Sequence, residues 1–359
     1  MADWEQFYRD LRTPDFVPGC EVLQRLGGGA FGEVYKARRR STGRPLAIKF
    51  LKLGEGDASR LVERELEHVR HLADLDHPNL VSIEDLGLAG GVPYLVMGFG
   101  GERTLAHELA AGPLQPRDAL TVFVQVCRGV AALHARRVVH FDLKPANVFL
   151  RGSGAKVGDY GLAKLIADGR QTLSMGRGTP HYMAPEVLRS RADHRADVYS
   201  LGVLLYESLT GQPPYPVGDG GLVTREDDRP PRFPDGYPAP LADLTGACLR
   251  LDPADRPASV AEVLDRLGQG ASEGDQIVLD ALGVSELETT SSRLEPGTAL
   301  TGTTLAERIA ELRRRLREPD PEAPLARRLA GRAAWVGLFA VLGFTVTLIA
   351  LVLLQELGR

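Results

Sequence analysis

Residues 138–150 read V-V-H-F-D-L-K-P-A-N-V-F-L, and residues 156–163 read K-V-G-D-Y-G-L-A. Transfer of a γ-phosphoryl group needs a base for the acceptor hydroxyl, a cation beside the moving group and ligands for Mg²⁺, because its catalysis is mainly positioning and charge compensation. Asp142 has the chemistry of the base, and Lys144 that of the cation. Asn147 and Asp159 offer the hard oxygen atoms that Mg²⁺ prefers. One short segment therefore contains all four side-chain types.

A glycine-rich run, G-G-G-A-F-G-E-V-Y-K-A, lies upstream at residues 27–37. Gly27, Gly29, Gly32 and Val34 fit the spacing G-x-G-x-x-G-x-V, in which glycines let backbone N–H groups approach phosphate oxygens. Taken alone, the run is explained equally well by a structural glycine hairpin. A Rossmann dinucleotide site is disfavoured, because a strand-like run follows where a helix should start.

Lys49 ends an apolar run 17 residues after Gly32. A lysine inside a strand that faces the interior needs a carboxylate, a phosphate or both as partners. The candidate carboxylates lie on a predicted helix over residues 59–75. We select Glu65 rather than Glu63 or Glu67, because apolar residues at 61, 62, 69 and 72 lie on its face.

The pattern along the chain changes near residue 101. Short apolar runs broken by Gly, Pro and basic turns, typical of strands, lie at residues 20–53, 80–86 and 94–97. Longer helical patterns lie at residues 118–135, 196–210 and 241–251. The sequence predicts an α+β protein with a small β-rich lobe, containing one helix, and a larger α-helical lobe.

Residues 20–267 resemble the eukaryotic-type, or Hanks-type, Ser/Thr protein kinases, including their bacterial membrane-anchored branch. The resemblance implies the two-lobed protein kinase fold and the use of ATP with Mg²⁺, for which Mn²⁺ can substitute. It implies transfer of the γ-phosphate to Ser/Thr hydroxyls of cytoplasmic proteins, with the chain itself among the candidate substrates. Lys144, two residues after Asp142, is typical of the Ser/Thr branch, and Thr179 is the threonine that contacts both residues there.

The resemblance also assigns site residues. The implied catalytic residues are Asp142, Lys144, Lys49 and Glu65. The implied metal ligands are Asn147 and Asp159. The implied nucleotide-binding residues are Gly27, Gly28, Gly29, Gly32, Val34, Ala47, Lys49, Met97 as gatekeeper, and Gly98 and Gly100 in the hinge. In addition, Asp197 is expected to brace the catalytic loop, and Arg256 to pair with Glu186 of the A-P-E tripeptide.

Two other functions are weighed against this one. A membrane-bound pseudokinase or scaffold would bind nucleotide or partner proteins without turnover, but Lys49, Asp142, Asn147 and Asp159 are all intact. A small-molecule kinase of similar fold is disfavoured by G-T-P-H-Y-M-A-P-E at residues 178–186, which in the family shapes a peptide site.

The sequence departs from the family pattern at several places. Phe141 replaces the arginine that commonly pairs with an activation-loop phosphate, so phosphorylation of Thr172 or Ser174 is not expected to be an obligatory switch. Tyr160 replaces phenylalanine in D-F-G and keeps the ring, so little harm is expected. His140 is expected to pack beneath the loop rather than to move a proton. The Pro- and Gly-rich residues 217–240 match poorly, which predicts a short docking helix or a loop.

Composition excludes some partners. A net charge of −4 gives no global signature for binding nucleic acid, and no nucleic-acid partner is predicted. The three cysteines are odd in number and lack C-x-x-C spacing, which argues against a disulfide framework and a zinc site. The soluble part is therefore expected in a reducing cytosol.

The C-terminal region predicts a membrane anchor. Residues 333–355 are 23 uncharged residues, roughly 34 Å of helix against about 30 Å of hydrocarbon, and a buried core helix is the less favoured alternative. Arg327, Arg328 and Arg332 precede this span, which places the kinase domain in the cytoplasm of a single-pass protein. The other expected segments are an N-terminal extension 1–19, a linker 268–303, a basic amphipathic juxtamembrane segment 304–332 and a tail 356–359. The juxtamembrane helix could pair with a second copy, lie on anionic lipid, or be an inert surface helix.

Overall fold

The computed structural model describes residues 4–11, 13–29, 32–51, 72, 75–160, 180–189, 192–215, 225, 228–235, 237 and 239–269. The chain divides into two units, residues 1–307 and 308–359, and every described residue belongs to the first. No helix within the described ranges is long and apolar enough to cross a bilayer. The predicted span 333–355, the linker and the juxtamembrane segment lie outside these ranges.

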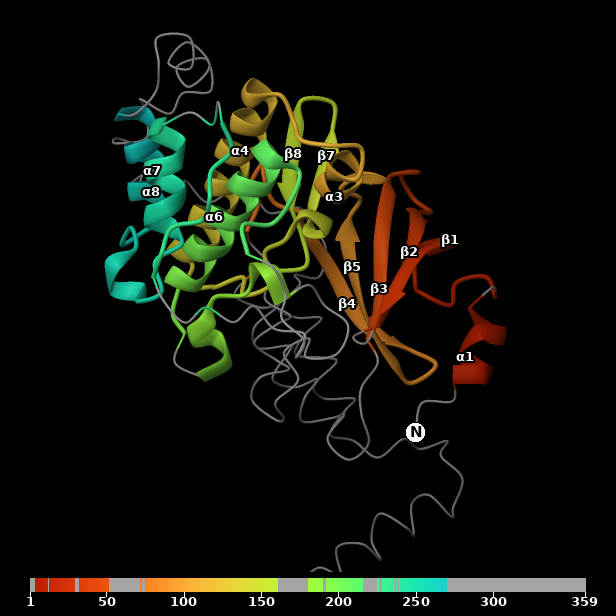
Figure 1. Ribbon diagram of the computed structural model, residues 1–359. Coiled ribbons are helices and arrows are strands. Elements are labelled where there is room, and N and C mark those ends of the chain that lie inside the picture. Colours follow the sequence, from red (N-terminus) through yellow and green to blue (C-terminus); the bar gives the residue numbers. More distant parts are fainter. Residues whose placement is uncertain are drawn as a thin grey trace, which may run out of the picture. The chain divides into compact units, whose positions relative to one another are not determined.

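The smaller lobe is an antiparallel sheet of five strands in the order β1-β2-β3-β5-β4 (Figure 1). The strands are β1 Cys20–Gly29, β2 Gly32–Arg39, β3 Pro45–Leu51, β4 Ile83–Ala89 and β5 Val92–Gly98. Successive side chains of a strand point to opposite faces of a sheet. In β2, Tyr35 and Ala37 are buried on one face, whereas Val34 and Lys36 on the other face are half-buried. The predicted β-rich lobe is thus confirmed, and its two faces have different environments.

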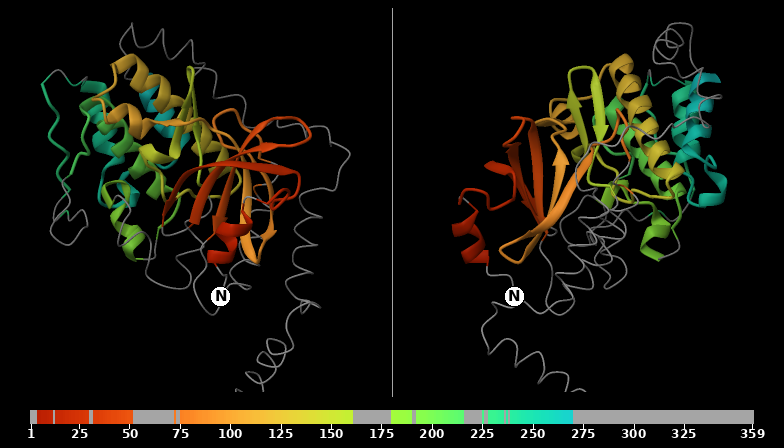
Figure 2. Two further views of the ribbon diagram at one scale, coloured as in Figure 1. Left: turned by 90° about the vertical axis from the view of Figure 1, so that its right-hand side faces the viewer. Right: turned by 180° about the vertical axis from the view of Figure 1, so that it is seen from behind.

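A helix from the N-terminal extension covers the outer face of this sheet. Helix α1, Trp4–Asp10, lies on the side of the sheet that faces away from the helical lobe (Figures 1 and 2). The Phe7 side chain is 1% exposed, and its ring centroid lies 4.8 Å from that of Phe50 on β3. Leu11, one turn further on, and Val17 are buried in the same cluster. The extension therefore completes the core of the small lobe, a role that the sequence analysis did not assign to it.

The larger lobe is mostly α-helical. Its helices are α3 Leu105–Leu109, α4 Pro116–Ala135, α6 Arg195–Thr210, α7 Ala239–Cys248 and α8 Val260–Gln269. Its short strands are β6 Arg103–Thr104, β7 Val148–Arg151 and β8 Gly154–Val157, and its 3-10 turns are η1 Pro145–Asn147, η2 Pro180–Tyr182, η3 Pro185–Arg189 and η4 Pro253–Asp255. Helix α6 is buried along most of its length and packs against α4 and α7.

The three predicted helices are confirmed with shifted ends. Helices α4, α6 and α7 begin one or two residues before the predicted starts at 118, 196 and 241, and α7 ends three residues before 251. Residues 228–235, within the poorly matching stretch 217–240, form no helix. A short docking helix or a loop was expected in that stretch, and residues 228–235 agree with the loop.

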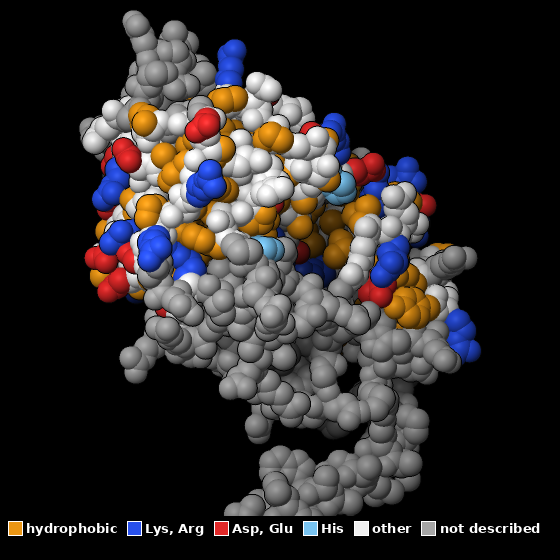
Figure 3. Space-filling view, viewed as in Figure 1, with side chains coloured by type: hydrophobic (Ala, Val, Ile, Leu, Met, Phe, Trp, Pro, Cys, Tyr) orange, Lys and Arg blue, Asp and Glu red, His pale blue; other side chains and the backbone are white. Residues whose placement is uncertain are grey.

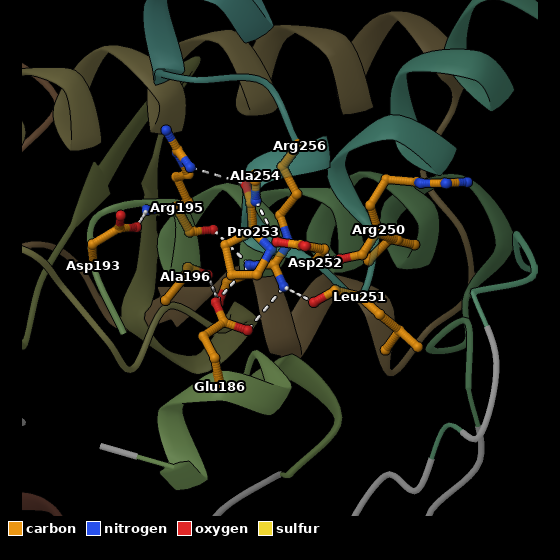
Figure 4. A network of polar contacts seen from close by, with 12 residues as sticks. Glu186, Asp193, Arg195, Ala196, Arg250, Leu251, Asp252, Pro253, Ala254 and Arg256 are labelled. Carbon is orange, nitrogen blue, oxygen red and sulfur yellow. Dashed lines mark hydrogen bonds and ion pairs between the residues drawn. The ribbon is translucent and has the colours of Figure 1, made fainter. Parts of the chain in front are cut away.

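A buried ion pair joins η3 to the segment before α8 (Figure 4). The Arg256 guanidinium donates to both carboxylate oxygens of Glu186, at 2.6 and 2.8 Å, as predicted. The remaining guanidinium donors reach the carbonyl oxygens of Arg250, Arg195 and Leu251, at 2.7 to 3.1 Å. Because both charges are paired and hydrogen-bonded, the guanidinium is tolerated at 0% exposure.

Candidate active site

The catalytic-loop segment is fixed from below by α6. The Asp197 side chain is fully buried, and its carboxylate accepts hydrogen bonds from the backbone N–H groups of His140, at 2.8 Å, and Phe141, at 2.9 Å. The His134 Nε2 atom of α4 lies 2.8 Å from the same carboxylate. Phe141 has a left-handed φ of 60°, which such bonds help to hold. The predicted brace is confirmed, and Asp142 follows directly from it.

His140 has no solvent access and both of its ring nitrogens are engaged. Its Nε2 atom donates to the carbonyl of Gly158 at 3.0 Å, and its Nδ1 atom accepts from the backbone N–H of Asp142 at 3.3 Å. The ring therefore connects the catalytic loop to the residue before Asp159. This confirms the expectation that His140 packs beneath the loop.

Asp142 is surrounded by the two residues predicted to work with it. The Lys144 ammonium donates to both carboxylate oxygens, at 2.9 and 2.7 Å. The Asn147 amide nitrogen donates to the Asp142 carbonyl at 2.8 Å and to its carboxylate at 3.2 Å. Since the amide nitrogen is used in this way, the amide oxygen of Asn147 is the atom left for a metal.

Lys49 meets a carboxylate from the opposite lobe. Its ammonium on β3 lies 2.9 Å from Asp159, which follows β8 and has a left-handed φ of 58°. Burial alone would raise the pKa of Asp159, but the charge and hydrogen bond of Lys49, helped by His140 and Lys144, hold that pKa below its ordinary value. The prediction that Lys49 needs an anionic partner is met here by Asp159. Glu65, the partner chosen from the sequence, lies outside the described residues.

These groups line one cavity of about 590 Å³ between the lobes, visible as a hollow with apolar walls in Figure 3. Among the predicted residues, the cavity is lined by Gly27, Gly28, Gly32, Val34, Ala47, Lys49, Met97, Gly98, Gly100, Asp142, Lys144, Asn147 and Asp159. Gly29 ends β1 opposite Gly32. One wall of the cavity thus consists of glycines and aliphatic side chains, and its polar end carries both positively and negatively charged side chains.

Several residues that line the cavity were not predicted from the sequence. The missed residues include Leu26, Val81, Phe149, Glu102, His107 and Met183. Leu26, Glu102 and Phe149 lie within two residues of predicted site residues, which is a local signal. The others come from segments that only the fold brings to the cavity.

Two glycines of the cavity have no room for a side chain. Gly32 has a φ of 152°, and a Cβ atom there would lie 2.0 Å from the carbonyl oxygen of Phe50. A Cβ atom on Gly100, in the hinge, would lie 2.8 Å from the Phe149 ring. At both positions the backbone lies so close to its neighbours that only glycine fits.

The D-Y-G tyrosine is anchored through its hydroxyl. Tyr160 is 3% exposed, and its hydroxyl donates to the carbonyl oxygen of Val81. Burial raises the pKa of Tyr160 above its ordinary value. A retained ring was expected from the sequence, and the structure adds this hydrogen bond. Thr172, Ser174 and Thr179 lie outside the described residues, so the expectations for them remain predictions.

Comparison with known proteins identifies the family. Residues 20–266 match the model of the protein kinase domain, and the chain belongs to this family. It is 35% identical over 269 residues to serine/threonine-protein kinase pkn2 of Myxococcus xanthus, covering 70% of this chain and 32% of that protein. It is 36% identical over 293 residues to serine/threonine-protein kinase PkaA of Streptomyces coelicolor, covering 76% of this chain and 54% of that protein.

A third relative is serine/threonine-protein kinase PknB of Mycobacterium tuberculosis, 32% identical over 304 residues, covering 79% of this chain and 49% of that protein. The match therefore covers about half or less of the length of each of these curated relatives. The likeness is to Hanks-type Ser/Thr kinases of bacteria, as the motifs indicated.

Proposed function

We propose that the chain transfers the γ-phosphoryl group of ATP to Ser and Thr hydroxyls of proteins. The observation that carries this proposal is the convergence of Lys49, Asp142, Lys144, Asn147 and Asp159 at the polar end of one cavity. Three curated relatives with Ser/Thr kinase names support it.

The residues present fit ATP and Mg²⁺. The aliphatic wall of Val34, Ala47 and Met97 suits a flat base, and the glycines leave room for phosphates beside backbone N–H groups. Within the described ranges, no three acidic, His or Cys side chains converge on a self-sufficient metal site. That fits Mg²⁺, which binds through one or two protein oxygens and completes its shell with phosphate oxygens and water. The Asp159 carboxylate and the Asn147 amide oxygen would hold it.

The side chains then have separate tasks. When bound with ATP, Mg²⁺ supplies positive charge that stabilises the phosphates during transfer. Asp142 orients the acceptor hydroxyl and accepts its proton, while the brace from Asp197 keeps the loop in place. Lys144 holds the Asp142 carboxylate and puts a cation beside the transferring group. Lys49, between the lobes, orients the phosphates.

The test is phosphoryl transfer by the purified full chain in detergent. The chain is incubated with γ-labelled ATP, Mg²⁺ and a generic protein acceptor, beside the Asp142→Asn variant. We expect label on phosphoserine and phosphothreonine after acid hydrolysis, and a loss of about 10²- to 10⁴-fold in the variant, the usual contribution of a positioned base. Equal, negligible label in both would favour the pseudokinase, and label on tyrosine alone would contradict the Ser/Thr assignment.

We also propose that residues 333–355 anchor the kinase domain to the cytoplasmic face of a membrane. Support comes from the uncharged run of 23 residues and from Arg327, Arg328 and Arg332 before it. The full chain should stay with membranes after a carbonate wash, and a chain ending at residue 300 should not. Release of both forms by the wash would contradict the anchor, and protection of the kinase domain from protease added on the cytoplasmic side would contradict the orientation.

A further inference from the structure

A buried carboxylate beside the glycine hairpin connects it to the N-terminal helix. Glu33 follows Gly32 on β2 and is 4% exposed. Its carboxylate accepts hydrogen bonds from the Tyr8 hydroxyl at 2.9 Å, from Arg25 Nε at 2.8 Å and from the Tyr35 hydroxyl at 3.3 Å. A buried carboxylate is tolerated only when it is paired and hydrogen-bonded in this way. Glu33 is therefore held from three directions.

The network spans both arms of the hairpin. Gly28 on β1 is the register partner of Glu33, one position before the Gly29–Gly32 pair at the tip. The Arg25 side chain lies across Gly28, where a Cβ atom would be 2.7 Å from the guanidinium. Gly28 and Gly32 both line the cavity. Glu33 is therefore linked directly to both glycines, by the chain to Gly32 and by strand pairing to Gly28.

One donor in the network comes from outside the sheet. Tyr8 lies on α1, and its neighbour Phe7 fixes the helix by packing its ring against Phe50 and Phe16, at centroid distances of 4.8 and 5.6 Å. The Tyr8 ring itself is 45% exposed, so its packing contributes less than that of Phe7. The hydrogen bond from its hydroxyl to Glu33 joins residues that are 25 positions apart in the sequence. The Tyr8 hydroxyl thus joins the docked helix to the hairpin by a hydrogen bond.

We infer that Tyr8 is a positioning residue for nucleotide binding, acting through Glu33 on the glycine hairpin. Ordering a glycine-rich segment over a ligand is entropically unfavourable, and a hairpin that is already fixed beside its tip loses less freedom on binding. The inference deepens the proposed function and rests on its assignment of this cavity to ATP. Tyr8 does not line the cavity and is not a catalytic residue.

The test compares Tyr8→Phe with the unaltered full chain. Removing only the hydroxyl keeps the ring and its edge contact with Phe7, at 5.4 Å. The Kd for Mg²⁺·ATP, measured by calorimetry without an acceptor, and the KM for ATP should rise about threefold to tenfold, a part of what one hydrogen bond to a charged group contributes. The kcat and the Tm should stay close to those of the unaltered chain. Tyr215→Phe, which removes a hydroxyl bonded to the Arg229 carbonyl in the other lobe, is the matched control and should leave Kd unchanged.

A double-mutant cycle with Glu33→Met, which removes the acceptor oxygens of the Tyr8 hydroxyl, separates positioning from packing. If Tyr8 acts through Glu33, the Kd of the double variant should equal that of Glu33→Met alone. Additive effects on Kd would overturn the inference, and so would a Kd for Tyr8→Phe within twofold of the unaltered chain. A lower Tm with unchanged Kd would overturn it too, by showing a purely structural role. Because Kd is measured without turnover, absence of phosphoryl transfer would count against the proposed function and leave this comparison intact.

Discussion

Two ion pairs of this chain differ in how completely their charges are paired and hydrogen-bonded. One is deeply buried, and the other lies at the end of an open cavity. The Arg256 side chain has 0% exposure, and its guanidinium is used by both oxygens of Glu186 and by three backbone carbonyls. Among the described residues, the Lys49–Asp159 pair has one contact of 2.9 Å, with 9% and 31% exposure, at the end of an open cavity. A pair of the first kind holds segments together. In a pair of the second kind, the ammonium and the carboxylate can still bind phosphates and a metal.

The largest expected effect on stability comes from breaking the satisfied pair. Arg256→Ala leaves Glu186 buried without a partner, which should lower the free energy of unfolding by about 3–5 kcal/mol. Denaturant unfolding of the full chain measures it. Arg266→Ala is the matched control, because the Arg266–Glu262 pair on α8 is 45% and 36% exposed and should contribute no more than about 0.5 kcal/mol. Similar losses in the two variants would contradict the contrast.

Lys49→Met should destabilise less, and in a pH-dependent way. The folded-state pKa of Asp159 is lowered, so its stabilisation is fully present above about pH 4 and is lost as pH falls through the lowered value. At pH 7 the variant should lose about 1–2 kcal/mol, because the carboxylate is 31% exposed. The gap between the two chains should narrow below pH 4. A gap that stays constant from pH 7 to pH 3 would show that Lys49 does not act through Asp159.

The smallest effect is expected from Tyr160→Phe, which restores the family's D-F-G. The ring stays, but the Val81 carbonyl loses its donor, so stability should fall by about 1 kcal/mol. The measurement is the denaturant midpoint at constant slope. An increase in stability would contradict this, because burying the hydroxyl would then cost more free energy than its hydrogen bond contributes.

The parts that the sequence predicted are those encoded by local spacing. Asp142, Lys144 and Asn147 lie within six residues, so any fold of that segment keeps them close. Helix α6 was predictable because its buried apolar residues are contiguous and Gly211 follows it. The ends of the predicted helices and strands were shifted by up to three residues.

The parts that the sequence did not predict depend on contacts between distant segments. Phe7 packs on Phe50, and the Tyr160 hydroxyl meets Val81, 79 positions away. Neither partner follows from periodicity, since an aromatic residue near a terminus and a tyrosine in a loop each have many available partners. For the same reason, Asp159 as the partner of Lys49 became visible only when the lobes were placed together.

The most direct test of the contrast between the two pairs is Asp159→Asn, measured for turnover and Tm in the same preparation. Asparagine keeps the shape of the side chain but weakens its hold on a divalent cation and removes its charge beside Lys49. We expect phosphoryl transfer at saturating ATP and Mg²⁺ to fall on the order of 10³-fold, the scale of losing one main electrostatic element, while the Tm shifts by only a few degrees. Turnover equal to that of the unaltered chain would contradict the account, because the loosely satisfied pair would then have no part in the chemistry.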